Sequence, residues 1–190
     1  MSIIIASKIE DRVVLICDSA ETSGDHLGIL TERERFKVLK MGDVLVGSAG
    51  RVKNIRRLAE HPEWFDTKGA PFDKKFIVTQ IIPNLFDELS KYKMLDTKGD
   101  NPKNQASIVM AHGNRIFCID RDLAVFEVDK FAAVGCTKSL IHPFLLDMKE
   151  GEEFDTMLRM MRLSSELSPS VRPPYHYVDT VSLEYTTLEE

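Results

Sequence analysis

The chain opens with the sequence MSIIIASKIEDRVVLICDS, residues 1–19. It contains two apolar runs, Ile3–Ala6 and Val13–Ile16, whose β-branched side chains favour strands. The charged residues between the runs suit a tight turn, so the stretch predicts an antiparallel β-hairpin. Ser2 directly precedes the first strand and Asp18 ends the second, so we expect both residues at the same end of the hairpin.

Outward from the hairpin, the first half of the chain continues with strands and then with helices. Residues 22–25 are polar and break the strand pattern. Residues Gly47–Gly50 lead into a helix whose apolar side chains, from Val52 to Ala59, share one face. A long helix is predicted over about residues 73–94, and Pro83 is expected to kink it. The further strands of this half are Phe36–Leu39 and Asp43–Val46.

The second half repeats this order. Two helices separated by Gly151 follow a run of strands, and Tyr175–Tyr185 is predicted as one last strand with period-two alternation. Two antiparallel sheets packed face to face, with helices on both outer faces, would bury every apolar stripe. The sequence therefore predicts an α+β fold, a four-layer αββα sandwich, as a single domain over residues 1–190. The strands of this half are Ser107–Ala111, Arg115–Ile119, Leu123–Val128 and Phe131–Val134.

The composition narrows the classes of function. The chain is 43% hydrophobic and 29% charged with a net charge of −5, which is unlike the basic balance of a nucleic-acid-binding protein. No apolar run approaches the roughly 18 residues of a membrane span, and the N-terminal run is too short for a signal peptide. The cysteines, Cys17, Cys118 and Cys136, lack metal-binding spacing, which favours reduced thiols in a cytoplasmic protein. No metal or cofactor site is predicted.

Ser2 is the residue with the clearest chemical potential. An N-terminal Ser, Thr or Cys acts as a nucleophile without a distant base, because its own α-amino group, with a pKa of about 8, accepts the side-chain proton. Ser2 gains this property only if Met1 is removed, and a small second residue permits that removal. The hydroxyl and the amine then need a carboxylate, a cation and a backbone N–H that faces the developing oxyanion.

Four stretches of the sequence together resemble one family. In order and spacing they are similar to proteasome β subunits, to the peptidase subunit of the bacterial two-component ATP-dependent protease, and to bacterial proteasome-like homologues. These proteins are N-terminal nucleophile hydrolases, and the resemblance extends over nearly the whole chain. The stretches are RVVLICDSAET (12–22), RFKVLKMGDVLVGSAG (35–50), ASIVMAHGNRIFCIDRDLAVFEVDKFAAVGCTKSLIHPFLLDM (106–148) and LSPSVRPPYHYVDTVSLEY (167–185).

The resemblance implies roles for residues of the first half. The family's Asp lies sixteen residues after the nucleophile, which matches Ser2 as nucleophile and Asp18 as carboxylate. Gly50 matches the glycine whose N–H serves the oxyanion, and counting back fifteen residues from it places Arg35 where the family has its catalytic Lys. An Arg stays charged, so Arg35 supplies a positive field and no proton transfer. Lys37, two residues on, takes this place instead if a bulge presents it.

The remaining matches lie in the second half. Cys136 falls where the family has a Ser beside the nucleophile's amine, and Thr137 offers a hydroxyl next to it. The family's late Asp is expected near residues 164–170, and no acid stands at its place. Ser168 or Ser170 is the predicted hydrogen-bonding substitute.

Each of these residues also has a purely structural interpretation. Asp18 ends a strand and caps a turn, Gly50 begins a helix, Arg35 pairs with a neighbouring Glu, and Cys136 is a small buried side chain. Taken together, the spacing and the resemblance predict a proteasome-like hydrolase that cleaves peptide bonds. Two alternatives stay open, a non-catalytic proteasome-like assembly or binding subunit and a small-molecule amidase on the same fold.

The resemblance also implies partners. Members of the family assemble as rings, so we expect a homo-oligomer. Peptides or unfolded proteins are the expected substrates, and an ATPase unfoldase is the expected source of them. Neither a nucleic acid nor a membrane is expected as a partner.

Overall fold

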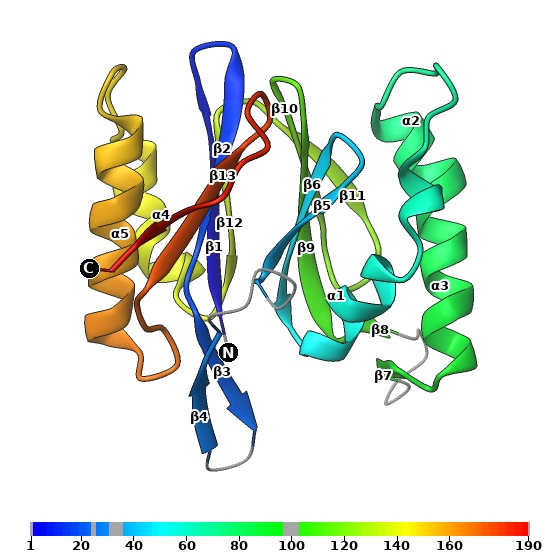
Figure 1. Cartoon of the computed structure of the whole chain (residues 1–190), viewed down its shortest axis with the longest axis horizontal. Helices are drawn as coiled ribbons and strands as arrows, with labels where there is room; N and C mark the ends of the chain where they lie inside the picture. Colours follow the sequence, from blue (N-terminus) through cyan, green and yellow to red (C-terminus); the bar gives the residue numbers. More distant parts are fainter. Residues whose placement is uncertain (1, 24–25, 31–35, 97–102, 190) are drawn as a thin grey trace.

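A computed structural model of the chain describes residues 2–23, 26–30, 36–96 and 103–189. Helices and antiparallel strands both contribute. In Figure 1 the strands occupy the middle, with two helices on one outer side and the remaining helices on the other. The first pair is α4 (Lys138–Leu146) and α5 (Glu153–Leu167), and the other side has α1 (Val52–Ala59), α2 (Lys74–Phe76) and α3 (Ile82–Lys91).

The N-terminal hairpin lies inside a five-stranded sheet of order β12-β1-β2-β13-β14. Strands β1 and β2 are antiparallel, with Ile4 opposite Cys17, which confirms the hairpin that the first nineteen residues predict. On its other side β1 pairs with β12, where Ile3 lies opposite Gly135. The strands of this sheet are β1 (Ile3–Ile9), β2 (Arg12–Cys17), β12 (Phe131–Gly135), β13 (Tyr175–Asp179) and β14 (Thr186–Leu188).

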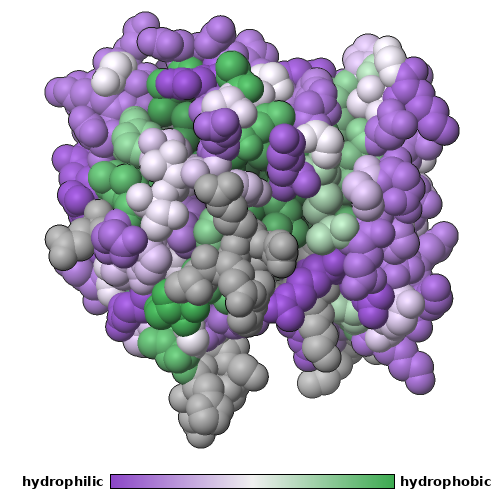
Figure 2. All heavy atoms as spheres, viewed as in Figure 1, coloured by the Kyte–Doolittle hydropathy of each residue, from purple (hydrophilic) through white to green (hydrophobic). Residues whose placement is uncertain are grey.

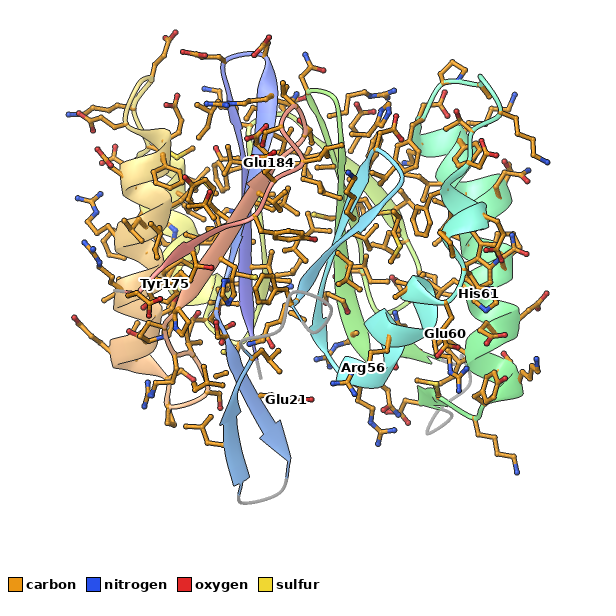
Figure 3. All side chains as sticks on the ribbon, viewed as in Figure 1. Glu21, Arg56, Glu60, His61, Tyr175 and Glu184 are labelled. Carbon is orange, nitrogen blue, oxygen red and sulfur yellow. The ribbon has the colours of Figure 1, made fainter. Side chains whose placement is uncertain are left out.

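A second five-stranded sheet, of order β11-β10-β9-β6-β5, is also antiparallel. Its strands are β5 (Val38–Met41), β6 (Val44–Gly50), β9 (Ala106–His112), β10 (Arg115–Ile119) and β11 (Val125–Val128). There are also two small two-stranded sheets among the described residues, β3 (Ala20–Ser23) with β4 (His26–Ile29) and β7 (Leu95–Asp96) with β8 (Lys103–Asn104). Arg56 of α1 forms an ion pair with Glu21 of β3 at 3.5 Å, and both are labelled in Figure 3.

Buried apolar side chains of the described residues form three clusters. The central cluster joins the two large sheets and includes Leu15 of β2 and Leu45 of β6. A second cluster packs β1 and β2 against α4 and α5, for example through Ile5 and Met157. The third packs the second sheet against α1 and α3 and includes Leu85. Removing this apolar surface from water is the main source of stability.

The outer surface follows from this arrangement. Figure 2 shows hydrophilic side chains over the outer helices and hydrophobic ones gathered between them, where the strands reach the surface. Within the described residues, no helix is long and apolar enough to cross a membrane.

Three strand predictions need correction. The predicted strand Tyr175–Tyr185 ends already at Asp179, because the Asp179 carboxylate accepts hydrogen bonds from the N–H groups of Val181 and Ser182, both at 2.8 Å, and caps a turn. The next strand, β14, begins only at Thr186. The polar stretch 22–25 begins within the β3–β4 hairpin, and residues 24 and 25 lie outside the described residues. The predicted strand Asp43–Val46 is β6, which continues through Gly47 to Gly50 before the helix α1 begins.

The long helix predicted over residues 73–94 also differs in detail. It runs from Lys74 to Lys91 and contains a π-helical turn at Ile77–Ile81, directly before α3. Pro83 lacks a backbone N–H and cannot complete the α-helical bond to the preceding turn. This missing bond falls at the π-helical turn, and both features are common causes of a bend in a helix.

Candidate active site

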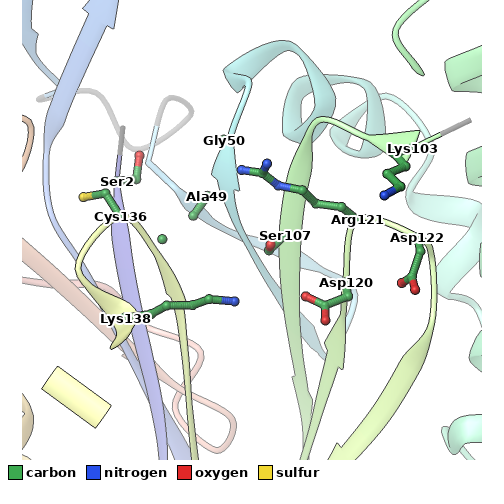
Figure 4. Close-up of a pocket in the computed structure, with 11 residues that line it drawn as sticks. Ser2, Ala49, Gly50, Lys103, Ser107, Asp120, Arg121, Asp122, Cys136 and Lys138 are labelled. Atoms are coloured by element: carbon green, nitrogen blue, oxygen red, sulfur yellow. The ribbon is translucent and has the colours of Figure 1, made fainter. Parts of the chain in front are cut away.

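Three of the predicted site residues line one pocket, with a volume of about 470 Å³ (Figure 4). Ser2 lies directly before β1, Gly50 ends β6, and Cys136 directly follows β12. Ser2 is buried, with 6% of its surface exposed, and it lines the pocket. Two sheets therefore bring together residues that are far apart in the sequence.

Asp18 fixes the chain beside Ser2. Its Oδ1 accepts a hydrogen bond from the N–H of Ile3, the residue after Ser2, at 3.0 Å. Its Oδ2 accepts the N–H of Ala20 at 3.0 Å and the ammonium of Lys37 at 2.6 Å. Burial raises the pKa of the Asp18 carboxyl, while the nearby Lys37 charge and the two N–H donors oppose that rise.

Lys37 is the cation that the structure places at Asp18. The sequence count favoured Arg35 for this position and kept Lys37 as a supporting residue; Arg35 itself lies outside the described residues. Lys37 directly precedes β5 and is almost completely buried, with 4% of its side chain exposed. A buried ammonium is stable only with a partner, and the Asp18 carboxylate is that partner.

A polar and aromatic network holds the segment that carries Lys37. The N–H of Ser48 donates to the Lys37 carbonyl at 3.1 Å, and the ring of Phe36 stacks on His176 with a centroid distance of 3.7 Å. The Nε2 of His176 lies 2.8 Å from the Ser19 hydroxyl. Sequence reasoning missed His176, because its neighbours come from distant strands and no local pattern relates them.

Gly135 allows the close approach of β12 to Ser2. The N–H of Cys136 donates to the Ser2 carbonyl at 2.9 Å, which ties the two segments together. Gly135 has a φ of +130°, and a Cβ atom there would lie only 1.9 Å from the Ser2 carbonyl oxygen. Only glycine fits such a backbone position. Gly135 was not among the predicted site residues, although a glycine between a strand and a helix is a signal for such an approach.

Gly50 is constrained in the same way at the opposite wall. Its φ is +142°, and an added Cβ would lie 2.5 Å from the Gln105 carbonyl oxygen and 2.6 Å from the Ala106 Cα. The requirement for glycine therefore comes from the pairing of β6 with β9. This backbone position lines the pocket that Ser2 also lines.

The supporting residues of the second half separate into two groups. The Cys136 thiol lies 3.8 Å from the Ser168 hydroxyl, and that hydroxyl accepts the N–H of Ser170 at 3.3 Å. Ser168 therefore stands next to Cys136, in the region where an acid was expected. Thr137 differs, since its hydroxyl donates to Ser164 of α5 at 2.9 Å and it does not line the pocket. Among the residues that the structure describes, no cluster of His, Cys, Asp and Glu could hold a metal ion.

Comparison with known proteins supports the fold. No family model and no curated protein matches the sequence. Among solved structures, BPH of Thiobacillus denitrificans, a bacterial proteasome homologue, aligns with a TM-score of 0.74 and 15% identity over 98% of both chains. Anbu (ancestral beta-subunit) from Yersinia bercovieri aligns with a TM-score of 0.75 and 12% identity, over 99% of this chain and 87% of Anbu.

A third structure, the helical assembly of the Anbu complex from Pseudomonas aeruginosa, aligns with a TM-score of 0.74 and 14% identity over 99% of this chain and 87% of the other. All three alignments extend over at least 98% of this chain at low sequence identity. The chain therefore has a proteasome-like fold.

Proposed function

We propose that this chain is an N-terminal nucleophile hydrolase that cleaves peptide bonds with Ser2. In this proposal residues 1–190 form one domain, a four-layer αββα sandwich in the cytoplasm, and Met1 is removed to free the Ser2 amine. The observation that carries the proposal is the Asp18 carboxylate, which binds both the Ile3 N–H, next to Ser2, and the buried Lys37 ammonium. If Asp18 only ended a strand and capped a turn, no buried lysine would be needed beside it.

The chemistry uses groups at the pocket and directly behind it. The Ser2 hydroxyl attacks the carbonyl carbon of the substrate amide, and the Ser2 amine takes the hydroxyl proton, directly or through water. The N–H of Gly50 stabilises the oxyanion. The leaving amine departs with the proton, and a Ser2 ester remains. Water then attacks this ester, the Ser2 amine again acts as base, and the acid product leaves with the Ser2 hydroxyl restored.

Lys37 supplies the positive charge of the site in place of Arg35. Its ammonium favours the neutral form of a nearby amine, which a general base needs, and stabilises negative charge as the hydroxyl loses its proton. Asp18 holds Lys37 and the backbone next to Ser2 in one arrangement. Cys136 and Ser168 are proposed to position the Ser2 amine, since the Cys136 N–H already holds the Ser2 carbonyl.

The similarity to proteasome-like structures also suggests how this chain assembles and which substrates it cleaves. The Pseudomonas Anbu protein forms a helical assembly, so we propose that copies of this chain also associate. Peptides or unfolded chains are the proposed substrates, and an ATPase unfoldase is the proposed partner that supplies them.

A second function, a non-catalytic assembly subunit on the same fold, is favoured by one observation. The residue beside Cys136 is Ser168, not a carboxylate, so the site lacks an acid where the resemblance predicts one. In that case the buried Asp18–Lys37 pair serves only to fix the N-terminal strand.

Hydrolysis of a fluorogenic peptide panel by the protein and by Ser2→Ala separates the two functions. We expect turnover in the parent protein, its loss in Ser2→Ala, and substantial activity in Ser2→Thr, which keeps a hydroxyl. Ser139→Ala, an exposed position on α4, is the control. Equal turnover in Ser2→Ala and the parent would exclude Ser2 as the nucleophile.

A further inference from the structure

The pocket that contains Ser2 also has a charged wall that the proposed chemistry does not use. Its cations are Lys103, Arg121 and Lys138, and its carboxylates are Asp120 and Asp122. Three cations against two carboxylates give this pocket a positive balance, although the whole chain has a net charge of −5. A positive pocket in an acidic protein attracts anionic groups to this one place.

The turn between β10 and β11 holds the backbone of Arg121 in place. The N–H of Asn104 in β8 donates to the Arg121 carbonyl at 2.7 Å. The turn itself is closed by the Leu123 N–H, which donates to the Asp120 carbonyl at 2.9 Å. The base of the Arg121 side chain is therefore fixed, while the side chain itself is exposed.

The two carboxylates of the wall have partners other than Arg121. Asp122 accepts the N–H of Ala124 at 3.1 Å, which accounts for one of its oxygens. In Figure 4 the carboxylate of Asp120 and the ammonium of Lys138 point toward one another. The guanidinium of Arg121 points toward the side of the pocket with Gly50 and Ser2. Arg121 forms no ion pair with any residue that the structure describes.

We propose that Arg121 determines substrate specificity by binding a carboxylate of the substrate close to the amide that Ser2 attacks. This inference rests on the proposed function and names its substrate class, acidic peptides. A guanidinium binds a carboxylate through two parallel N–H···O bonds, which fixes both its position and its orientation. The carboxylate comes either from an acidic side chain next to the scissile bond or from a free C-terminus on the leaving side.

A matched peptide panel tests the proposal and separates these two sources. One series carries Glu, Gln or Lys at each position that flanks the scissile bond, and the other compares a free C-terminus with its amide. We expect the parent protein to prefer Glu over Gln, or a free over an amidated C-terminus, by about ten- to hundredfold in kcat/KM, the range of one charge-assisted hydrogen-bonded pair. Equal values in both comparisons would overturn the proposal.

Variants assign the preference to one side chain. Arg121→Ala is expected to lower the preference to about twofold or less, and Arg121→Glu to reverse it in favour of Lys. Lys138→Ala removes the same charge from the same pocket, and Arg159→Glu changes the net charge on the exposed face of α5. Both should keep most of the preference. An equal loss in Lys138→Ala and Arg121→Ala would mean that general charge, and not contact with Arg121, selects the substrate.

Binding separates this inference from the proposed hydrolysis. Fluorescence anisotropy with labelled Glu and Gln peptides measures affinity whether or not the peptides are cleaved. One outcome is that the parent binds the Glu peptide more tightly than the Gln peptide, that Arg121→Ala abolishes this difference, and that neither peptide is cleaved. This outcome would overturn the hydrolase and support the anion site. Cleavage without a carboxylate preference would support the hydrolase and overturn the anion site. Absence of both would overturn both.

Discussion

The Nζ of Lys37 lies 2.6 Å from the Oδ2 of Asp18, and the two side chains are 4% and 0% exposed. Taking two charges out of water is costly, and a well-packed apolar pair is often as stable as a buried ion pair. Stability alone is thus a weak reason for this pair. Its position, one hydrogen bond away from the residue that follows Ser2, gives it a chemical reason.

Replacing Lys37 with Met should remove activity and also destabilise the protein. The change leaves the buried Asp18 carboxylate without its cation, which costs about 3–5 kcal/mol of unfolding free energy in comparable pairs. Urea unfolding and peptide hydrolysis measure the two effects. Arg35→Met is the informative comparison. If Arg35→Met lost activity while Lys37→Met kept it, Arg35 and not Lys37 would be the cation that the reaction needs.

Replacing Gly135 with Ala should displace Ser2. The new Cβ would lie 1.9 Å from the Ser2 carbonyl oxygen, so one of the two strands must move. Gly151→Ala is the matched control, since Gly151 also has a positive φ of +83° but nothing lies within 4 Å of an added Cβ. We expect Gly151→Ala to cost about 1–2 kcal/mol of stability and keep activity. Gly135→Ala should lose activity and more stability than the control, and equal effects would contradict this account of the Ser2 position.

His176 should make the protein less stable in mild acid. Burial lowers the pKa of its imidazole below the ordinary 6.5, helped by the Lys37 charge and opposed by the Leu30 carbonyl and Glu189. As the pH falls through 6.5, the unfolded chain takes up a proton that the folded chain does not. The unfolding free energy therefore decreases, by at most about 1.4 kcal/mol per pH unit for one proton.

Urea unfolding of the parent and His176→Gln at pH 7.5 and 5.5 measures this contribution. The variant should lose part of the pH dependence, whereas His142→Gln on the exposed side of α4 should keep it. An identical pH dependence in the parent and His176→Gln would show that His176 contributes nothing in this range.

Cys136 should be the first thiol to react with iodoacetamide in the native protein. Burial raises the pKa of Cys17 to about 12 and that of Cys118 to about 11, so both stay protonated and unreactive near neutral pH. Cys136 is partly exposed and lines the pocket. Peptide mapping of the alkylated protein by mass spectrometry identifies the site. Faster labelling of Cys17 than of Cys136 would contradict the buried position of Cys17.

The sequence predicts the part of the site that lies within the N-terminal hairpin, namely Ser2 and Asp18. The apolar runs around Lys8–Asp11 fix a two-stranded register, and this register brings the start of β1 next to Asp18. Two β-branched apolar runs and a charged turn are enough for that result. Gly50 was identified through the family resemblance, whereas its position at the end of β6 was not predicted.

The remaining site residues come together through tertiary packing, which no local sequence pattern predicts. Counting back from Gly50 pointed to Arg35, which lies outside the described residues, whereas Lys37 is the cation that the structure shows buried against Asp18. The Ser168 contact with Cys136 joins α5 to the end of β12. Arg121 reaches the pocket from the β10–β11 turn, and only the packing of two sheets puts that turn near Ser2.

The most direct test of the central claim is the intact mass of the protein purified from the cells that make it. The mechanism needs a free amine on Ser2, so we predict a mass lower than that of the full sequence by one methionine residue, with Ser2 as the first residue. A protein that retains Met1 has no free amine at Ser2, and that result would contradict the proposal that Ser2 is a self-activating nucleophile.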